Sequence, residues 1–190
     1  MSAIWSELLS YSLLELIAVA ASVIYIVFAA NNNRWCWPAA FVGSAIFAAV
    51  FWRYNLLMDS ALNVYYTVMA IYGWLVWNRH QSNEAEAPII DRSVRFHVTA
   101  IASVVLLSIC SGYWLSQNTA ASFPYLDSFT TWGSLLATWM LTQRMIENWL
   151  YWIAFDSVSI YLYLNKSLMF TVALFSLYII MSLFGCYKWH

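Results

Sequence analysis

The chain contains the stretch ENWLYWIAFD at residues 147–156, which opens an apolar run that ends near residue 164. Trp149, Trp152 and Asp156 are spaced at i, i+3 and i+7, so they share one face of a helix. The run is long enough to cross a hydrocarbon core of roughly 30 Å. A carboxylate at that depth is costly unless it faces a partner, a cavity or a ligand. The stretch therefore predicts a membrane-spanning helix with a functional polar stripe.

The composition of the whole chain is that of an integral membrane protein, with the lipid bilayer as its main surroundings. Of its 190 residues, 63% are hydrophobic and only 9% are charged. Soluble domains are closer to half apolar and a quarter charged, so this chain has too little polar surface to face water. The formal net charge of −1 also excludes the basic surface typical of proteins that bind nucleic acid.

Seven apolar runs are long enough to be membrane spans. They lie near residues 11–30, 37–52, 56–77, 94–115, 125–142, 148–164 and 167–187. Short polar segments separate them, and none of these segments is large enough to form a soluble domain. The sequence therefore predicts one all-α membrane domain over residues 1–190, with seven transmembrane helices.

The distribution of basic residues predicts the orientation in the membrane, because cytoplasmic loops are enriched in Lys and Arg. With the amino terminus outside, the residues facing the cytoplasm are Arg34, Arg79, Arg92, Arg95, Arg144 and Lys188. Only Arg53 and Lys166 then face outward. We therefore expect the amino terminus outside and the carboxyl terminus in the cytoplasm.

The chain also repeats itself. A shift of 112 residues without gaps aligns Trp37 with Trp149, and the same shift pairs Gly73 with Gly185, Tyr66 with Tyr178 and Trp77 with Trp189. Spans one to three and five to seven then form two triplets of the same orientation, joined by one linker span. This predicts a 3+1+3 parallel repeat, with the first triplet at 11–77, the linker at 94–115 and the second triplet at 125–187. A substrate would bind near the midplane, between the triplets.

Polar and aromatic side chains within the spans are the candidate binding residues. Flat aromatic faces beside a carboxylate suit a small, planar, cationic molecule. The candidates are Asn148, Trp149, Trp152, Asp156 and Tyr163 on the sixth span, and Asn63, Tyr66 and Trp74 on the third.

Each of these interpretations has a simpler alternative. Asp156 could be a structural acid bonded to Ser or Tyr of a neighbouring span, and Trp149 and Trp152 could anchor a helix at the headgroup level. Trp77 is most simply read as such an anchor, and Glu147 as a solvated partner of Arg144.

Motifs of soluble enzymes do not occur in the sequence. It has no Gly-rich phosphate loop, no H-E-x-x-H and no G-x-S-x-G. The three histidines and three cysteines are scattered without metal-ligand spacing. We therefore expect no enzyme activity, no cofactor and no metal, and any transport would be passive or coupled to an ion.

Two motifs connect the chain to a known family. The third span ends in IYGWLVW at residues 71–77, and the sixth opens with ENWLYW at residues 147–152. With these motifs, the sequence resembles the PnuC family of bacterial vitamin transporters over nearly its whole length. The resemblance implies a fold similar in plan to the SWEET transporters, a homotrimer, and facilitated diffusion of an unphosphorylated vitamin across the inner membrane. It further implies a cytoplasmic kinase that traps the vitamin by phosphorylation.

The family divides by substrate among nicotinamide riboside, thiamine and riboflavin. Members that carry nicotinamide riboside tend to have Gln where this chain has Asn63, and Asn where it has Ala70 and Asp156. The chain is more similar to the thiamine branch, which matches its Asp156 and the I-x-L-Y run at residues 160–163. The resemblance thus favours thiamine, with nicotinamide riboside as the alternative. Both carry a permanent positive charge, whereas riboflavin is neutral and ranks third.

Overall fold

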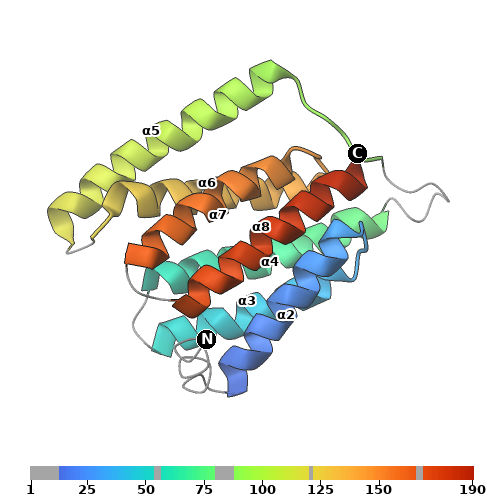
Figure 1. The fold of residues 1–190 in the computed structure, drawn as a ribbon, viewed down its shortest axis with the longest axis horizontal. Helices are drawn as coiled ribbons and strands as arrows, with labels where there is room; N and C mark the ends of the chain where they lie inside the picture. Colours follow the sequence, from blue (N-terminus) through green and yellow to red (C-terminus); the bar gives the residue numbers. More distant parts are fainter. Residues whose placement is uncertain (1–12, 54–56, 80–87, 120–121, 166–168) are drawn as a thin grey trace.

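A computed structural model of the chain describes residues 13–53, 57–79, 88–119, 122–165 and 169–190. Seven α-helices occupy these residues (Figure 1): α2 (Leu13–Ala30), α3 (Cys36–Arg53), α4 (Leu57–Arg79), α5 (Val94–Asn118), α6 (Pro124–Thr142), α7 (Asn148–Asn165) and α8 (Met169–Trp189). Their ends differ from the predicted spans by no more than three residues. Residues 11–12, 56 and 167–168 of the predicted spans lie outside the described residues.

The helices differ in how apolar they are. In the described part of the chain, four are long and apolar enough to cross a membrane on those grounds alone, namely α2, α3, α5 and α8 from Thr171 onward. The remaining three, α4, α6 and α7, carry polar side chains that lie wholly or partly inside the bundle, such as Thr67, Thr138 and Asp156. Buried serines on three of the more apolar helices, namely Ser44 on α3, Ser108 on α5 and Ser182 on α8, lie in the interior as well.

The helices form two triplets and one peripheral helix. In the first triplet α2 packs on α3 and α3 on α4, and in the second α6 packs on α7 and α7 on α8. The triplets meet through α2 against α8 and through α4 against α6, which are equivalent contacts under the repeat. Among the described elements α5 packs mainly on α6, meets α7 through the side chains of His97 and Tyr151, and lies along the outside of the bundle (Figure 1). The predicted 3+1+3 arrangement is confirmed.

The turns between the first and second helices of the triplets have the same backbone. Asn32 and Arg144, which are 112 residues apart, have φ values of 51° and 54°, in a region that residues other than glycine seldom adopt. Each donates its N–H to the carbonyl three residues earlier, at 2.9 and 3.0 Å. The next residues, Asn33 and Met145, donate to the carbonyl five residues earlier, at 2.9 and 3.1 Å. The sequence repeat is therefore also a repeat of backbone conformation.

Four buried tryptophans occupy the core between the triplets, and we call Trp37, Trp77, Trp149 and Trp189 the tryptophan cluster. Trp37 and Trp77 meet edge to face with ring centroids 5.4 Å apart, and Trp149 and Trp189 do so at 5.3 Å. Trp77 and Trp189 join the two pairs at 6.3 Å. The interpretation of Trp77 as a headgroup anchor is wrong, because its side chain is 0% exposed.

Two glycines make room for this cluster. A Cβ atom added to Gly73 would overlap the ring of Trp37, and one added to Gly185 would lie 2.6 Å from the ring of Trp149. The glycines therefore allow an indole to lie directly on the backbone of the third helix in each triplet, as small residues do at other membrane helix contacts.

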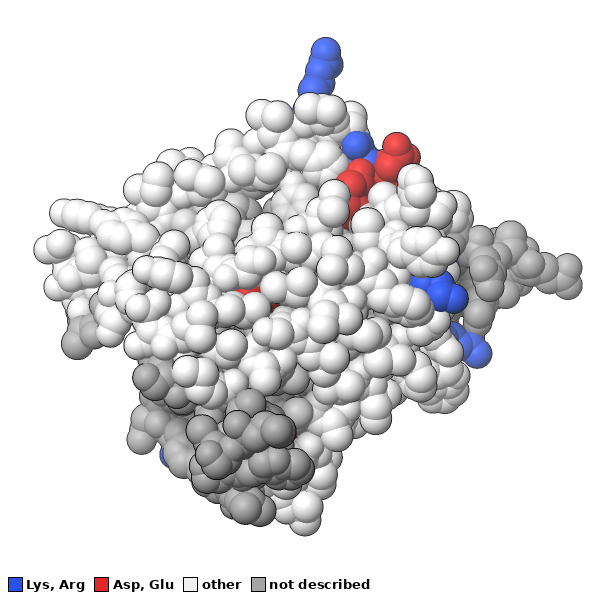
Figure 2. All heavy atoms as spheres, viewed as in Figure 1, with Lys and Arg blue, Asp and Glu red and all other residues white. Residues whose placement is uncertain are grey.

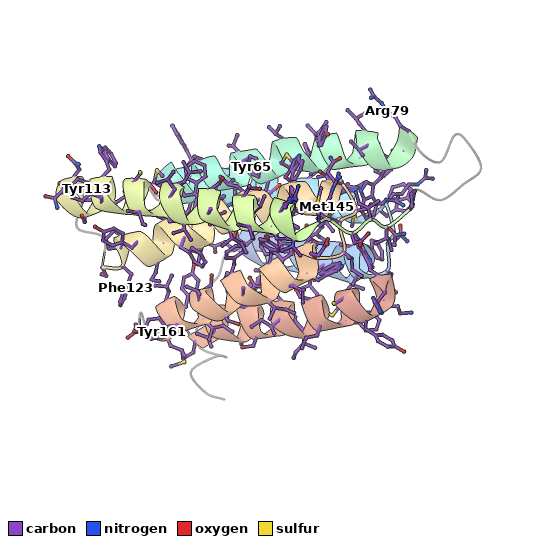
Figure 3. The ribbon with its side chains drawn as sticks, turned by 90° about the horizontal axis from the view of Figure 1, so that it is seen from above. Tyr65, Arg79, Tyr113, Phe123, Met145 and Tyr161 are labelled. Carbon is purple, nitrogen blue, oxygen red and sulfur yellow. The ribbon has the colours of Figure 1, made fainter. Side chains whose placement is uncertain are left out.

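The two ends of the bundle differ in charge. On the face drawn in Figure 2, charged side chains gather mainly toward the end where the carboxyl terminus lies in Figure 1, and most of the broad surface is uncharged apart from an acidic group near its middle. Figure 3 places Arg79 at this end and Tyr113, Phe123 and Tyr161 at the opposite one. We call the end that carries Arg79 the basic end.

Candidate functional site

Asp156 lies near the middle of α7 and is 3% exposed. It follows Asn148, the first residue of the helix, by eight positions, or about 12 Å along the axis. Among the residues that the structure describes, its carboxylate has no hydrogen-bonding or ion-pair partner. A buried carboxylate without a partner is unfavourable in a membrane, so this position is the centre of the candidate site.

Two tyrosines from opposite triplets lie near this carboxylate. Tyr66 on α4 and Tyr178 on α8 are both close enough to Asp156 for electrostatic interaction. Tyr66 lies close to Ser134 on α6, and Tyr178 close to Ser22 on α2. The two pairs are equivalent under the 112-residue shift, and each one crosses from one triplet to the other. Asp156 therefore lies where the triplets meet.

The repeat is broken at the carboxylate itself. The residue 112 positions before Asp156 is Ser44, which is buried and has hydrogen-bonding partners on α3 and α4. Its hydroxyl donates to the carbonyl of Ala40 at 2.7 Å and accepts from Thr67 at 2.9 Å. Of these two equivalent positions, only the one in the second triplet carries a carboxylate, so the site is suited to a ligand whose charge lies at one end.

The tryptophans and the asparagine at the start of α7 are buried toward the basic end. Trp149 is 1% exposed and packs on Gly185 and Trp189, which excludes the headgroup-anchor alternative for this residue. Trp152 is partly buried against the same core. Asn148 donates to the carbonyl of Met145 at 2.6 Å, and its Oδ1 has no partner within the described residues.

The other predicted site residues lie farther along the helices. Trp74 lies toward the basic end, with its ring centroid 5.5 Å from that of Trp35. Asn63 donates from its side chain to a carbonyl of its own helix at 2.9 Å. Tyr163 stacks on Phe175 with ring centroids 5.3 Å apart, roughly 10 Å along α7 beyond the carboxylate.

Several residues near the carboxylate were absent from the predicted set. They are Tyr178, Ser22 and Ser134, together with Tyr25, which interacts electrostatically with both Tyr66 and Tyr178. The repeat contains a signal for one of them, because it pairs Tyr178 with the predicted site residue Tyr66.

Glu147 joins the start of α7 to the linker helix α5. Its Oε1 accepts the backbone N–H of Arg92 at 2.7 Å and lies 3.2 Å from Nε2 of His97. The other ring nitrogen of His97 lies 3.0 Å from the hydroxyl of Tyr151. The predicted partner, Arg144, instead places its guanidinium over the ring of Trp77, 4.3 Å from the centroid. The predicted pairing of Glu147 with Arg144 is therefore wrong.

The contacts of Glu147 predict a loss of stability in acid. Burial raises its pKa, but hydrogen bonds from the Arg92 N–H, its own backbone and His97 outweigh burial and hold the pKa below its ordinary value of 4.5. Because the pKa of Glu147 is lower in the folded protein than in the unfolded chain, Glu147 stabilises the fold at pH values above its ordinary pKa. This stabilisation is lost as the pH falls through the lower pKa of the folded protein. We expect the apparent Tm of the detergent-solubilised protein to decrease as the pH is lowered through these two pKa values, and we expect a smaller decrease in Glu147→Gln.

Thermal unfolding followed by intrinsic fluorescence between about pH 3 and pH 7 measures this effect. Asp91→Asn is the matched control, because Asp91 is a nearby exposed carboxylate. A pH dependence in Glu147→Gln as steep as in the parent protein would show that Glu147 does not contribute.

Two helix triplets of like orientation, joined by one linker helix and enclosing a buried carboxylate, define a membrane transporter of the parallel-repeat class. Comparison with known proteins gives the family. The chain belongs to the PnuC family, because the family described as nicotinamide mononucleotide transporter matches residues 12–190.

Individual relatives are distant in sequence. The riboflavin/roseoflavin transporter RibM of Streptomyces davaonensis is 23% identical over 98% of this chain and 84% of its own length. The nicotinamide riboside transporters PnuC of Escherichia coli and Haemophilus influenzae are 22% and 29% identical, over 64% and 74% of this chain. The alignments cover 62% of each PnuC relative, so the chain spans less than two thirds of their length.

A solved structure supports the fold. The crystal structure of the vitamin B3 transporter PnuC superposes with a TM-score of 0.75, covering 93% of this chain and 80% of that one. At 20% identity this similarity concerns the fold, and it agrees with the seven-helix arrangement described above.

Proposed function

We propose that the protein is a facilitator that carries nicotinamide riboside, a vitamin with a permanent positive charge, across the bacterial inner membrane. The observation that carries the proposal is the buried carboxylate of Asp156, flanked by Tyr66 and Tyr178 and without a cationic partner among the described residues. A pyridinium ring placed there supplies the missing charge. It also presents a flat face to the neighbouring aromatic side chains.

The energetics of such a site are adequate for vitamin uptake. A micromolar dissociation constant corresponds to about 8 kcal/mol. A desolvated cation–π contact contributes about 2 kcal/mol, and the buried carboxylate adds attraction that is weakly screened inside the bundle. Transport does not require tighter binding than this, because a facilitator must also release its substrate on the other side of the membrane.

The relatives support the choice of vitamin. The sequence motifs favour thiamine, but the related proteins are named as carriers of nicotinamide riboside and riboflavin, which moves nicotinamide riboside to first place. Thiamine stays the second candidate, because Asp156 matches the thiamine branch and its thiazolium charge would be balanced equally well. Riboflavin is neutral and would leave the carboxylate without a cation.

The proposal includes the rest of the transport cycle. The triplets at 11–77 and 125–187 rock against each other about the linker at 94–115, with the amino terminus outside and the basic end in the cytoplasm. Three copies assemble into a homotrimer, and a cytoplasmic kinase phosphorylates the vitamin, so that net uptake continues without an ion gradient.

Counterflow in proteoliposomes tests this function. Vesicles preloaded with unlabelled nicotinamide riboside should take up the labelled compound transiently, whereas vesicles without protein should not. A protein that senses or scaffolds without transporting would show no exchange, and that result would refute the proposal. Accumulation above the outside concentration under an imposed pH gradient would replace facilitated diffusion with proton coupling.

A further inference from the structure

The third helices of the two triplets meet through indole rings. In the described residues of α4 and α8, no pair of Cα atoms lies within 8 Å. The rings of Trp77 and Trp189 nevertheless lie 6.3 Å apart, one from each helix. Side chains therefore fill the space between the triplets at this level, close to where both helices end.

Each of these indoles is also hydrogen-bonded across the boundary between the triplets. Trp77 on α4 donates its Nε1–H to the carbonyl of Thr142 on α6 at 3.1 Å. Trp189 on α8 donates its Nε1–H to the carbonyl of Ala29 on α2 at 3.2 Å. Both bonds are buried, and both would break if the triplets separated at the basic end.

The cluster lies between the candidate site and the basic end. Trp149 precedes Asp156 by seven residues, or about 10 Å along α7 in the direction of the basic end. Arg144, which is 7% exposed and precedes α7, covers the ring of Trp77. A molecule that moved from Asp156 along α7 toward the basic end would therefore meet these rings.

From these contacts we infer that the tryptophan cluster is the gate of the transport pathway at the basic end, and that the gate is closed in this structure. The inference rests on the proposed transport function. Trp37 and Trp149 are held against Gly73 and Gly185 of their own triplets, so they move with those triplets. Opening therefore occurs between Trp77 and Trp189.

The test uses a cysteine reporter beside the site. Ser159 is 7% exposed and lies one turn beyond Asp156. In a full-length background with the three native cysteines replaced by alanine, Ser159→Cys is labelled with a membrane-impermeant thiol reagent in right-side-out and inverted vesicles. Trp77→Ala/Trp189→Ala should raise the labelling rate about tenfold or more from the basic-end side, and leave the rate from the other side unchanged.

A matched control separates gating from the general loss of indoles. Trp52→Ala/Trp114→Ala removes two tryptophans that are 66% and 61% exposed, and it should leave labelling as in the parent. If Trp77→Ala/Trp189→Ala does not fold, Trp77→Phe/Trp189→Phe decides, because it keeps an aromatic ring at each position while it removes both N–H donors and part of the bulk of each indole. Faster labelling in a protein that elutes like the parent supports the gate.

Unchanged labelling in whichever of these variants folds would overturn the gate, as would an increase from the opposite side alone. Labelling needs no vitamin, so its outcome is independent of the counterflow result. If the protein exchanges no vitamin but the variants label as expected, the proposed transport function is refuted, and the closure of the basic end by the tryptophan cluster still holds. If vitamin exchange is normal but labelling is unchanged in the variants, the transport function holds and the gate is refuted.

Discussion

Replacing Asp156 by asparagine should weaken binding of nicotinamide riboside by about tenfold or more, equivalent to about 1.4 kcal/mol, while the protein stays folded. Asparagine keeps the size and shape of the side chain and one acceptor oxygen, and it removes the negative charge. The carboxylate is 3% exposed, so its attraction for a cation is only weakly screened. Isothermal titration calorimetry of the purified protein measures the change.

Two comparisons make this prediction specific to charge. Asp59→Asn makes the same change at an exposed position on α4 and should leave the affinity as it is. The dihydro form of nicotinamide riboside lacks the pyridinium charge, so it should bind the parent protein and Asp156→Asn about equally. If Asp156→Asn binds the cation as tightly as the parent does, Asp156 is not part of the site.

The second large effect is expected at the glycines beneath the tryptophan cluster. Gly73→Ala and Gly185→Ala should each destabilise the protein by roughly 1–3 kcal/mol, the usual cost of overpacking a core. The added Cβ would overlap the ring of Trp37 in one case and lie 2.6 Å from the ring of Trp149 in the other. Both rings are buried on all sides, so they cannot turn away.

Gly43→Ala is the matched control for these substitutions. Its Cβ would lie 3.1 Å from the hydroxyl oxygen of Ser22, a tight but much milder contact. Thermal unfolding in detergent should give a lower apparent Tm for Gly73→Ala and Gly185→Ala than for Gly43→Ala. Equal values for all three would mean that the tryptophans adapt and that the close approach is not needed.

Much of this fold could be predicted from the sequence. A helix that crosses a bilayer needs a long apolar run, and such runs can be located directly in the sequence. The 112-residue repeat further predicted that the helices form two triplets joined by a linker helix. Asn32 and Arg144 share a left-handed backbone although their side chains differ, so the 112-residue register reflects backbone geometry as well as composition.

The site was predictable only where its residues share a helix. The stripe of Trp149 and Asp156 follows from helical spacing, but the contacts of Tyr178 join residues far apart in sequence. Trp77 was misread because an indole two residues from Arg79 looks like a headgroup anchor, whereas packing between the triplets buries it. Glu147 was misread because its partners His97 and Arg92 come from the linker side of the chain.

The most direct test of the central claim is a calorimetric titration of the purified protein with nicotinamide riboside, thiamine and riboflavin in turn. A buried carboxylate between the triplets predicts that nicotinamide riboside binds in about the micromolar range, that thiamine is the only other vitamin to compete, and that riboflavin gives no heat. Tight binding of riboflavin with no heat from either cation would contradict the account, because the charge of Asp156 would then have no role in recognition.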